Sequence, residues 1–332
     1  MERILDCTMR DGGYVNNWDF SKEQAQKCYE AALESGISYC EVGFRRTPDG
    51  GSFGPWYYAP ESLLNDTFVV QAKCKLAVMA QMGTFTISDF VPKSESLVTM
   101  VRVLIPYHCK NKDDTVLDTD IISDTVSMCK SLHELGYETS INIGRIDKLS
   151  EIQIHELCLL IRGAPIKYLY IADTYGNLGI YKMRKIIATL KQYYTGAIGF
   201  HAHDNLQNAS IKSIDALYNG ASIVDVTFGG YGRGSGNAKA ELVLAHMIMS
   251  GSEEYKLLPA LVYADKYVQK YTQSGVVYLL TGMTSMHVNY AIEVIEKWSD
   301  LSIEKVYDTF GKIVESGKHN FYFPDVFTHA LL

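Results

Sequence analysis

Short apolar runs rich in β-branched residues recur along this 332-residue chain, and most are separated by stretches whose apolar residues have helical spacing. Several runs are apolar on both faces, as buried strands are when helices cover one face and packed side chains fill the other. The pattern predicts a parallel sheet built from repeated βα units. The eight predicted strands are Ile4–Thr8, Tyr39–Phe44, Lys75–Gln81, Thr99–Ile105, Thr139–Gly144, Tyr168–Asp173, Ile198–His203 and Ile223–Phe228.

The number and order of these runs favour one fold class. Eight strands that alternate with helices and end near residue 250 are typical of a closed barrel, whereas a doubly wound sheet usually has fewer strands and a glycine-rich first turn. The first turn, Arg10-Asp11-Gly12-Gly13, lacks the G-x-G-x-x-G spacing. We therefore predict an α/β protein with a (β/α)8 TIM barrel. The clearest predicted helices are Lys22–Ser35, Ile121–Leu135, Ser150–Ile161, Lys182–Tyr193, Leu206–Tyr218 and Ala238–Met249.

The pattern changes after Gly251, where helical spacing continues without strands. We predict a TIM-barrel catalytic domain over residues 1–250 and a helical C-terminal segment over residues 251–332. Within this segment, we expect a turn at Gly282–His287 to return to the barrel mouth. The helices predicted in the segment are Glu253–Gln273, Asn289–Trp298 and Ile303–Glu315.

Composition limits the classes of function. Hydrophobic residues make up 47% of the chain and charged residues 21%, which is the balance of a soluble globular protein. The formal net charge of -7 argues against nucleic acid as a partner, because neutralising phosphates needs a basic face. The seven cysteines are odd in number and include no C-x-x-C pair, so we expect neither a disulfide framework nor a zinc finger. No signal peptide or membrane-spanning apolar stretch is evident, so we expect a cytoplasmic protein without a membrane partner.

Polar residues that follow two of the predicted strands have the spacing of metal ligands. The chemistry of an α/β barrel lies at the C-terminal ends of its strands. His201 and His203 are two residues apart on a strand, so both point the same way and can ligate one ion. Asp11 follows the first strand, which only one strand separates from the seventh in a closed barrel. The alternative is a histidine pair bonded to carbonyl groups.

Two histidines and one carboxylate leave coordination positions open for substrate and water. Asn237 is a candidate fourth ligand, or a group that supports the ligands from behind. The ligand types do not choose among Mn²⁺, Mg²⁺, Co²⁺, Fe²⁺ and Zn²⁺, and Mn²⁺ is our first expectation.

Three further features near strand ends are candidates for contact with substrate. Arg10 offers a fork of donors to an anionic oxygen, or forms a surface pair with Asp11. Asp173, which Thr174 follows, ends a strand and can bond Arg10 or a ligand, or cap a helix. The glycine-rich stretch Gly229–Gly236 is either a phosphate-binding turn or a tightly packed turn, and we favour tight packing.

In these motifs the sequence resembles the HMG-CoA lyase-like family of metal-dependent barrels. The family includes 4-hydroxy-2-oxovalerate aldolases, isopropylmalate and homocitrate synthases, and the carboxyltransferase domain of pyruvate carboxylase. The resemblance covers residues 1 to about 250, with the family's strand-one signature at Asp6–Gly12 and its H-x-H-D-N signature at His201–Asn205. A glycine-rich stretch ending in G-N stands at Gly229–Asn237. The aldolase branch is the nearest in pattern, because the segment from Gly282 to Glu293 falls where that branch has its helical tail.

The resemblance implies a mechanism and names the residues for it. Asp11, His201 and His203 would hold the metal. The metal and Arg10 would bind a 2-oxo acid and stabilise its enolate while an adjacent carbon–carbon bond breaks or forms. The resemblance does not set the direction of the reaction.

Two departures from the aldolases concern the base that acts on the substrate hydroxyl. Tyr14 stands where the aldolases have a histidine base, and Thr284 aligns with a tyrosine of their tail. Tyrosine has an unperturbed pKa of about 10 and is a weak base at neutral pH. His287 lies close to Thr284 in the sequence and is a candidate for the missing base, or a histidine at a helix start or on the surface.

The leading hypothesis is a carbon–carbon lyase of the aldolase type that acts on a hydroxylated 2-oxo acid. An acyl-CoA-dependent Claisen synthase is a related alternative, although such enzymes usually carry a longer C-terminal portion. A metal-binding barrel subunit that has lost catalysis is another, motivated by Tyr14 and Thr284. The sequence leaves open a homo-oligomer or a partner enzyme bound through the C-terminal helices.

Overall fold

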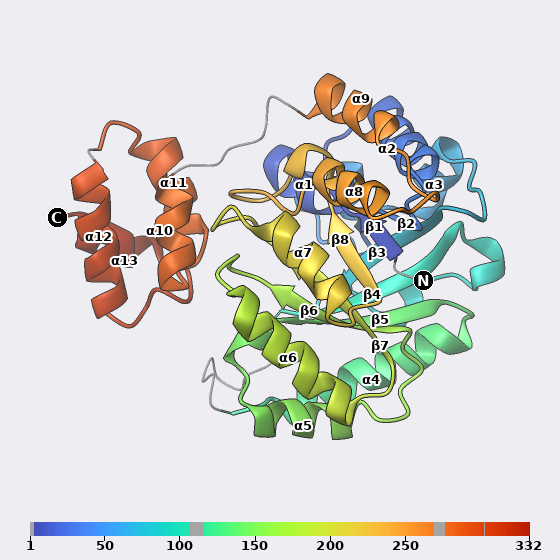
Figure 1. Cartoon of the computed structure of the whole chain (residues 1–332), viewed down its shortest axis with the longest axis horizontal. Helices are drawn as coiled ribbons and strands as arrows, with labels where there is room; N and C mark the ends of the chain where they lie inside the picture. Colours follow the sequence, from blue (N-terminus) through green and yellow to red (C-terminus); the bar gives the residue numbers. More distant parts are fainter. Residues whose placement is uncertain (1–2, 107–115, 269–275, 302) are drawn as a thin grey trace.

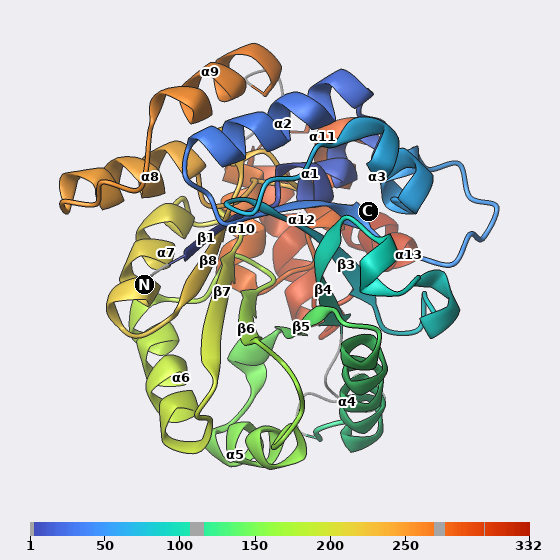
Figure 2. The same cartoon turned by 90° about the vertical axis from the view of Figure 1, so that its right-hand side faces the viewer.

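A computed structural model describes residues 3–106, 116–268, 276–301 and 303–332. Within them, eight parallel strands pair in chain order and close into a barrel, since β1 pairs with both β2 and β8. Figures 1 and 2 show helices around this barrel, which confirms the TIM-barrel prediction. The strands are β1 (Arg3–Asp6), β2 (Tyr39–Phe44), β3 (Lys75–Gln81), β4 (Val98–Ile105), β5 (Glu138–Gly144), β6 (Tyr168–Asp173), β7 (Ala197–Ala202) and β8 (Ile223–Val226).

Three strands end earlier than predicted. β1 ends at Asp6, β7 at Ala202 and β8 at Val226, before the predicted ends at Thr8, His203 and Phe228. His203 instead forms an isolated antiparallel bridge with Asn237. The chain after β8 therefore folds back over the end of β7 and brings Asn237 beside the histidines.

The helices between the strands lie close to their predicted positions. Those after β2 and β3 are short: α3 (Glu61–Thr67) follows β2, and 3-10 turns at Ile87–Asp89 and Lys93–Glu95 follow β3. Ser21 and Ser150 begin α2 and α5 with capping boxes, in which the serine and the glutamine three residues later bond each other's backbone. The longer helices around the barrel, including these two, are α2 (Lys22–Glu34), α4 (Thr119–Glu134), α5 (Glu151–Leu160), α6 (Ile180–Tyr193), α7 (Ala209–Tyr218) and α8 (Ala240–Met249).

The segment after β1 is a helix, α1 (Thr8–Asn16), and not the turn that was expected at Arg10-Asp11-Gly12-Gly13. Glycine costs about 1 kcal/mol relative to alanine inside a helix. Packing requires it here, because a Cβ on Gly12 would lie 2.3 Å from the Tyr231 ring and one on Gly13 would lie 2.1 Å from the Trp18 ring. Tertiary contacts therefore outweigh the low helix propensity of this segment.

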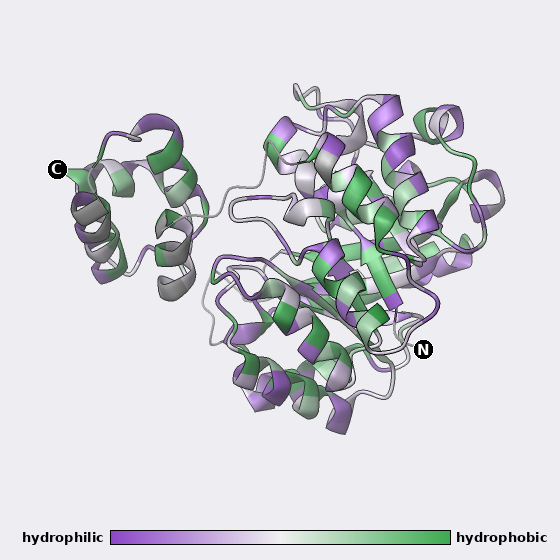
Figure 3. Ribbon diagram, turned by 45° about the horizontal axis from the view of Figure 1, so that its top comes forward, coloured by the Kyte–Doolittle hydropathy of each residue, from purple (hydrophilic) through white to green (hydrophobic). Residues whose placement is uncertain are grey.

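Side chains inside the barrel change from apolar to charged along the strands. Residues two apart on a strand face the same side. Glu41, Arg102 and Asp225 each stand two residues after an apolar residue that points into the barrel, on β2, β4 and β8. A larger core fills the space between the strands and the helices, whose outward faces carry hydrophilic residues (Figure 3). The apolar layer inside the barrel consists of Leu5, Cys7, Tyr39, Ala77, Met100, Tyr168, Tyr170 and Ile223.

The chain after α8 divides between two cores. α9 (Leu258–Tyr267) packs on α2, and Tyr263 and Val268 join the core of the barrel. The helices that follow have a separate core around Tyr290 and Phe310. We therefore propose that the helical segment begins after α9 and not at residue 251. Its helices are α10 (Val276–Thr284), α11 (Asn289–Lys297), α12 (Ile303–Glu315) and α13 (Pro324–Leu331).

Several expectations fall partly outside the described residues. The predicted helix Glu253–Gln273 corresponds to the shorter α9, and its last residues are not described. The six described cysteines are buried and free, and Cys109 lies outside the described residues. None of the described helices is both long and apolar enough to cross a membrane.

The helical segment contacts the barrel at the ends of its strands. The Tyr175 hydroxyl donates to the carbonyl of Asn320 at 2.8 Å, and the Asn205 amide donates to the Thr281 hydroxyl at 3.2 Å. The segment therefore lies against the face of the barrel on which α/β barrels carry their chemistry.

Candidate active site

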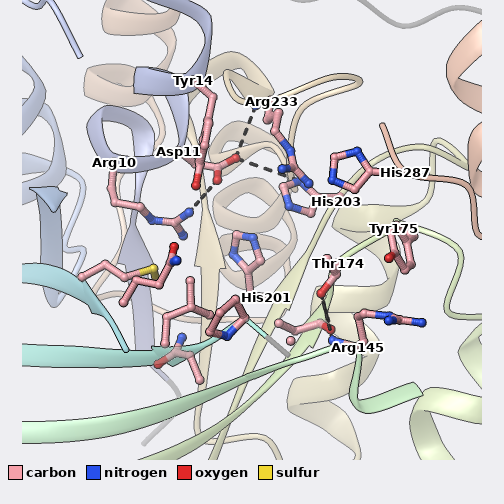
Figure 4. A pocket seen from close by; sticks show the side chains of 17 residues that line it. Arg10, Asp11, Tyr14, Arg145, Thr174, Tyr175, His201, His203, Arg233 and His287 are labelled. Atoms are coloured by element: carbon pink, nitrogen blue, oxygen red, sulfur yellow. Dashed lines mark hydrogen bonds and ion pairs between the residues drawn. The ribbon is translucent and has the colours of Figure 1, made fainter. Parts of the chain in front are cut away.

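A cavity of about 280 Å³ opens at the C-terminal ends of the barrel strands (Figure 4). Its walls come from α1, from the ends of several strands and from the chain between α10 and α11. Residues that are far apart in the sequence therefore meet in one place. The predicted site residues that line the cavity are Arg10, Asp11, Tyr14, Thr174, His201, His203 and His287.

Three of these residues have the geometry of a metal site. Asp11, His201 and His203 offer ligand atoms that all lie within 4.8 Å of one another, and all three residues are buried. Asp11 comes from α1, directly after β1, whereas the histidines come from the end of β7. The barrel closure between β1, β8 and β7 thus assembles the group that the sequence spacing suggested.

Hydrogen bonds at Nδ1 orient both histidine rings. The His201 Nδ1 atom lies 3.0 Å from the Asp225 carboxylate, and the His203 Nδ1 atom lies 3.3 Å from the Gly236 carbonyl. Both partners are acceptors, so in the neutral form of each ring Nδ1 carries the proton and Nε2 keeps a free lone pair. Burial lowers the pKa of His203 to about 3, which keeps its ring neutral. Neutral rings held in this way are the form that ligates a cation.

The Asp11 carboxylate is ionised and accepts hydrogen bonds on both of its oxygens. Burial opposes its ionisation, but the Arg10 guanidinium 2.5 Å away holds its pKa well below the usual range. The Asn237 amide nitrogen lies 2.6 Å from the other carboxylate oxygen. A Cβ on Gly232 would lie 2.6 Å from that same oxygen. The glycine-rich stretch therefore packs tightly against the site, as favoured above, and glycine is required at Gly232.

A chain of buried charges lies behind these ligands. Glu41 accepts from Arg10 at 2.7 Å and from Arg102 at 2.9 Å through one carboxylate oxygen. Arg102 also donates to Asp225 at 2.6 Å, and its guanidinium lies over the Tyr170 ring, 4.2 Å from the centroid. Burial opposes the ionisation of Asp225, but Arg102 holds its pKa below the usual value. The network fixes Arg10 at one end and, through Asp225, His201 at the other.

Glu41, Arg102 and Asp225 were missed in the sequence, although a signal for them was present. Each is a single charged residue inside an otherwise apolar run: YCEVGF, VTMVRVLI and IVDV. A charge on a strand that is buried on both faces must be paired, because burying an isolated charge is very costly. Three such charges on different strands of one barrel therefore indicate an internal ion-pair network.

We predict that Arg102→Met lowers the free energy of unfolding by about 3–5 kcal/mol, because it leaves two buried carboxylates without their shared cation. Equilibrium unfolding in urea would measure this change. Arg184→Met is the matched control, since Arg184 is exposed and pairs with Asp215 on the surface, and it should change stability by less than about 1 kcal/mol. If both variants have the same stability, the network contributes nothing to the fold.

Asp173 lies elsewhere than expected. It is buried, forms an ion pair with Lys212 and accepts from the backbone of Leu178 at 3.1 Å, and it is absent from the cavity lining. The structure therefore contradicts the expectation that it bonds Arg10, whose partners are Asp11 and Glu41. The reason is that the buried ammonium of Lys212 reaches the end of β6 from α7 and needs a counter-charge.

Thr174 and Thr284 differ in whether they line the cavity. Thr174 lines the cavity, and its hydroxyl accepts from the backbone of Arg145 at 2.9 Å. Thr284 bonds back to the carbonyl of Leu280 inside α10 and is not part of the lining. Thr174 is thus the member of the predicted substrate-binding pair that faces the cavity.

The two candidates for the base differ in their hydrogen bonds. Tyr14 lies one helical turn after Arg10 on α1, lines the cavity and is 40% exposed. His287 also lines it, so the chain after α10 returns to the barrel mouth as expected. Its Nδ1 accepts from the backbone of Asn289 at 3.2 Å, and burial lowers its pKa to about 3. A neutral ring that accepts at Nδ1 carries its proton on Nε2, which makes that atom a donor.

The HMGL-like family model matches residues 2–268, from the start of the barrel to the end of α9. The chain belongs to the HMGL-like family. A 4-hydroxy-2-oxovalerate aldolase of Geobacillus genomosp. 3 is 26% identical over 268 residues, which are 80% of this chain and 76% of that protein. A 4-hydroxy-2-oxovalerate aldolase 2 of Salinispora arenicola is 27% identical over 301 residues, with 88% and 83% covered.

Two solved structures have a similar architecture. The N-terminal domain of a candidate aldolase from Bacteroides vulgatus is similar at a TM-score of 0.76 and 25% identity, covering 91% of this chain and 98% of that chain. An HMG-CoA lyase from Bacillus subtilis has a TM-score of 0.69 at 15% identity, with 82% and 94% covered, and supports the fold alone. Within this family the chain is an aldolase or lyase, an enzyme of the carbon–carbon lyase class.

Proposed function

We propose that this chain is a divalent-metal-dependent aldolase that cleaves or forms the bond between C3 and C4 of a 4-hydroxy-2-oxo acid. The observation that carries the proposal is the meeting of Asp11, His201 and His203 within 4.8 Å on the wall of a cavity, with Arg10 on the same carboxylate. The HMGL-like relatives named as 4-hydroxy-2-oxovalerate aldolases support the substrate class.

The residues present fit a cation. Both histidine rings present free Nε2 lone pairs, and the Asn237 side-chain oxygen is buried without a hydrogen-bond partner among the described residues. A divalent ion held by Asp11, His201 and His203 would give that oxygen a partner, and Asn237 is the fourth ligand that we propose. When bound, the ion would polarise the substrate's oxo group as a Lewis acid. This mixed donor set suits several divalent metals. Mn²⁺ is the first of them to test.

Arg10 supplies the charge that an enolate requires. Its Nε atom is held by Glu41 and one terminal nitrogen by Asp11, which fixes the guanidinium plane at the cavity wall. A guanidinium fixed in advance stabilises negative charge that develops on the enolate oxygen without reorganising during the reaction. Glu41 therefore acts as a positioning residue, since Arg102 on its far side shares the same carboxylate oxygen.

In this proposal the substrate hydroxyl passes its proton to the Tyr14 oxygen while the phenol's own proton passes to solvent water, which Tyr14 reaches because it is 40% exposed. The hydrogen bond at Nδ1 of His287 favours a donor role for that ring over the base role that the sequence suggested. The Tyr175 hydroxyl is committed to the carbonyl of Asn320. Tyr14 is the remaining tyrosine of the lining, and it lies one helical turn from Arg10.

The test of the proposed function is hydrogen exchange at the methyl group of pyruvate. We expect protein loaded with Mn²⁺ to exchange these protons with deuterated solvent, measured by proton NMR, because reversible enolate formation needs no second substrate. Arg10→Ala should slow the exchange by about 10²–10³-fold, the loss found when one oxyanion donor is removed, while metal content stays unchanged. Absence of exchange above the metal-free control would instead support a binding subunit without catalysis.

A further inference from the structure

Three side chains in one row of the barrel line the cavity on the side away from the proposed metal ligands. Gln81 ends β3, Leu104 pairs with it on β4, and Asn142 pairs with Leu104 on β5. In the closed barrel β4 is four strands from β8 in either direction, whereas Asp11 and the two histidines follow or end β1 and β7, the neighbours of β8. The row therefore faces the cation-binding group across the cavity.

The Gln81 side chain presents a hydrogen-bond donor to the cavity. The Arg46 guanidinium donates to Gln81 Oε1 at 3.1 Å. That guanidinium is itself held over the rings of Phe44 and Tyr57, 4.7 and 4.5 Å from their centroids. Because a guanidinium can only donate, the amide oxygen of Gln81 must face it. The amide nitrogen has no hydrogen-bond partner among the described residues and is not enclosed, so it is open to the cavity that Gln81 lines.

Asn142 presents a second donor in the same way. It is 2% exposed, and its Oδ1 accepts from the Ser140 hydroxyl at 2.9 Å. Within the described part of the chain its amide nitrogen has no partner, and this nitrogen too is not enclosed and meets the cavity. A nearly buried donor requires an acceptor, which is either a water molecule or a ligand oxygen.

The spacing of the two amides suits a particular kind of ligand. Gln81 and Asn142 stand two strands apart, about 10 Å between their backbones, and the apolar Leu104 lies between them. Both donors are neutral, so they bind hydroxyl or carbonyl oxygens without requiring a charge on the ligand. The sequence of donor, apolar contact and donor matches a carbon chain that carries hydroxyl groups.

We propose that the aldehyde half of the substrate is a hydroxyaldehyde, whose hydroxyl oxygens accept from Gln81 and Asn142 while its carbon chain contacts Leu104. The oxo and carboxylate groups of a 2-oxo acid are on adjacent carbons and both stay near Arg10 and the cation-binding group, so the chain beyond C4 is the part that crosses the cavity. The inference rests on the proposed function and adds the class of the aldehyde. The cavity of about 280 Å³ lies at the low end for ligand sites, so this aldehyde is short.

The reaction with such a substrate balances without a further reagent. In the cleavage direction the C4 hydroxyl passes its proton to the Tyr14 oxygen, the C3–C4 bond breaks, and its electron pair forms the enolate of pyruvate. The enolate then takes a proton at C3, and the hydroxyaldehyde leaves with C4 as its carbonyl carbon. An alkyl chain in the same place would leave the amide nitrogens of Gln81 and Asn142 without an acceptor from the substrate.

The test measures the addition of pyruvate to two aldehydes of matched shape by the enzyme loaded with Mn²⁺. Glyceraldehyde carries two hydroxyl groups, and 2-methylbutyraldehyde has a methyl group in place of each. We expect kcat/KM to be at least about 10-fold higher for glyceraldehyde, because a site built to bind hydroxyl groups discriminates against an analogue that lacks them. Pyruvate exchange, measured on the same preparation, reports the proposed function separately.

Variants then assign the preference to the two amides. Gln81→Leu and Asn142→Leu should each lower the ratio of kcat/KM between glyceraldehyde and 2-methylbutyraldehyde by about 3- to 10-fold, the worth of one hydrogen bond between neutral groups. Gln192→Leu is the control, because Gln192 is exposed on α6 and lies outside the cavity lining, and it should keep the ratio. A ratio within each variant removes general losses of folding or metal and the different reactivity of the two aldehydes. Gln81 is only partly buried at a strand end, so Gln81→Leu keeps the test decisive if Asn142→Leu does not fold.

Two results would overturn the inference while pyruvate exchange persists. One is equal or greater kcat/KM for 2-methylbutyraldehyde in the wild-type enzyme. The other is an unchanged ratio in the folded variants. If both aldehydes then lose activity in parallel, the amides contact the pyruvate half, and if neither does, another group binds the hydroxyls. Loss of exchange in the wild type would refute the proposed function instead.

Discussion

Replacing His201 and His203 together by alanine should abolish metal binding, whereas the wild-type chain should retain about one divalent ion after dialysis. The double variant leaves only Asp11 and the proposed fourth ligand Asn237, and Asp11 already accepts from Arg10 and Asn237. One carboxylate with competing donors and one amide oxygen cannot offset the loss of hydration of a divalent cation. Elemental analysis of dialysed protein measures the occupancy.

The matched control is His133→Ala with His155→Ala, because both side chains are exposed and lie outside the cavity. This control should keep the ion. Thermal unfolding of the metal-free proteins would show whether the site variant is folded. A folded site variant with full occupancy would contradict the ligand assignment.

The second large effect concerns the proton of the substrate hydroxyl. Tyr14→Phe should slow cleavage of a 4-hydroxy-2-oxo acid by about 10²–10⁴-fold, the usual worth of a general base, and leave pyruvate exchange intact because no hydroxyl proton is involved. His287→Gln should keep cleavage within about tenfold, since a glutamine amide replaces a donor but cannot replace a base. Steady-state cleavage and exchange rates on the same preparations separate the two roles.

The reverse result has an equally definite meaning. If His287→Gln loses cleavage and Tyr14→Phe keeps it, His287 is the base, and its hydrogen bond from Asn289 must break in the complex with substrate. If both variants keep full cleavage, a water molecule in the cavity takes the proton. Tyr14→Phe removes one oxygen from a side chain that is 40% exposed, so a loss of folding is not expected to obscure the result.

Much of the fold and part of the site could be predicted from local patterns. Strands such as Tyr39–Phe44 have their predicted bounds because an apolar run ends where polar residues begin. The pair His201 and His203 and the carboxylate of Asp11 could be found for a similar reason, since strand spacing and the order of strands in a closed barrel place them together. The helix α1 was missed because the segment after the first strand was expected to be a turn, and tertiary packing makes it helical despite its two glycines.

What the sequence by itself determined, then, is the barrel and the residue types at its strand ends, because alternation and spacing are properties of neighbouring residues. Only the tertiary structure decided which charges meet. Asp173 faces Lys212 and not Arg10, while Glu41 and Asp225 share Arg102 across the inside of the barrel. These pairings depend on barrel closure and on how loops fold back, and a buried charge is stable only beside the partner that the closed barrel brings to it.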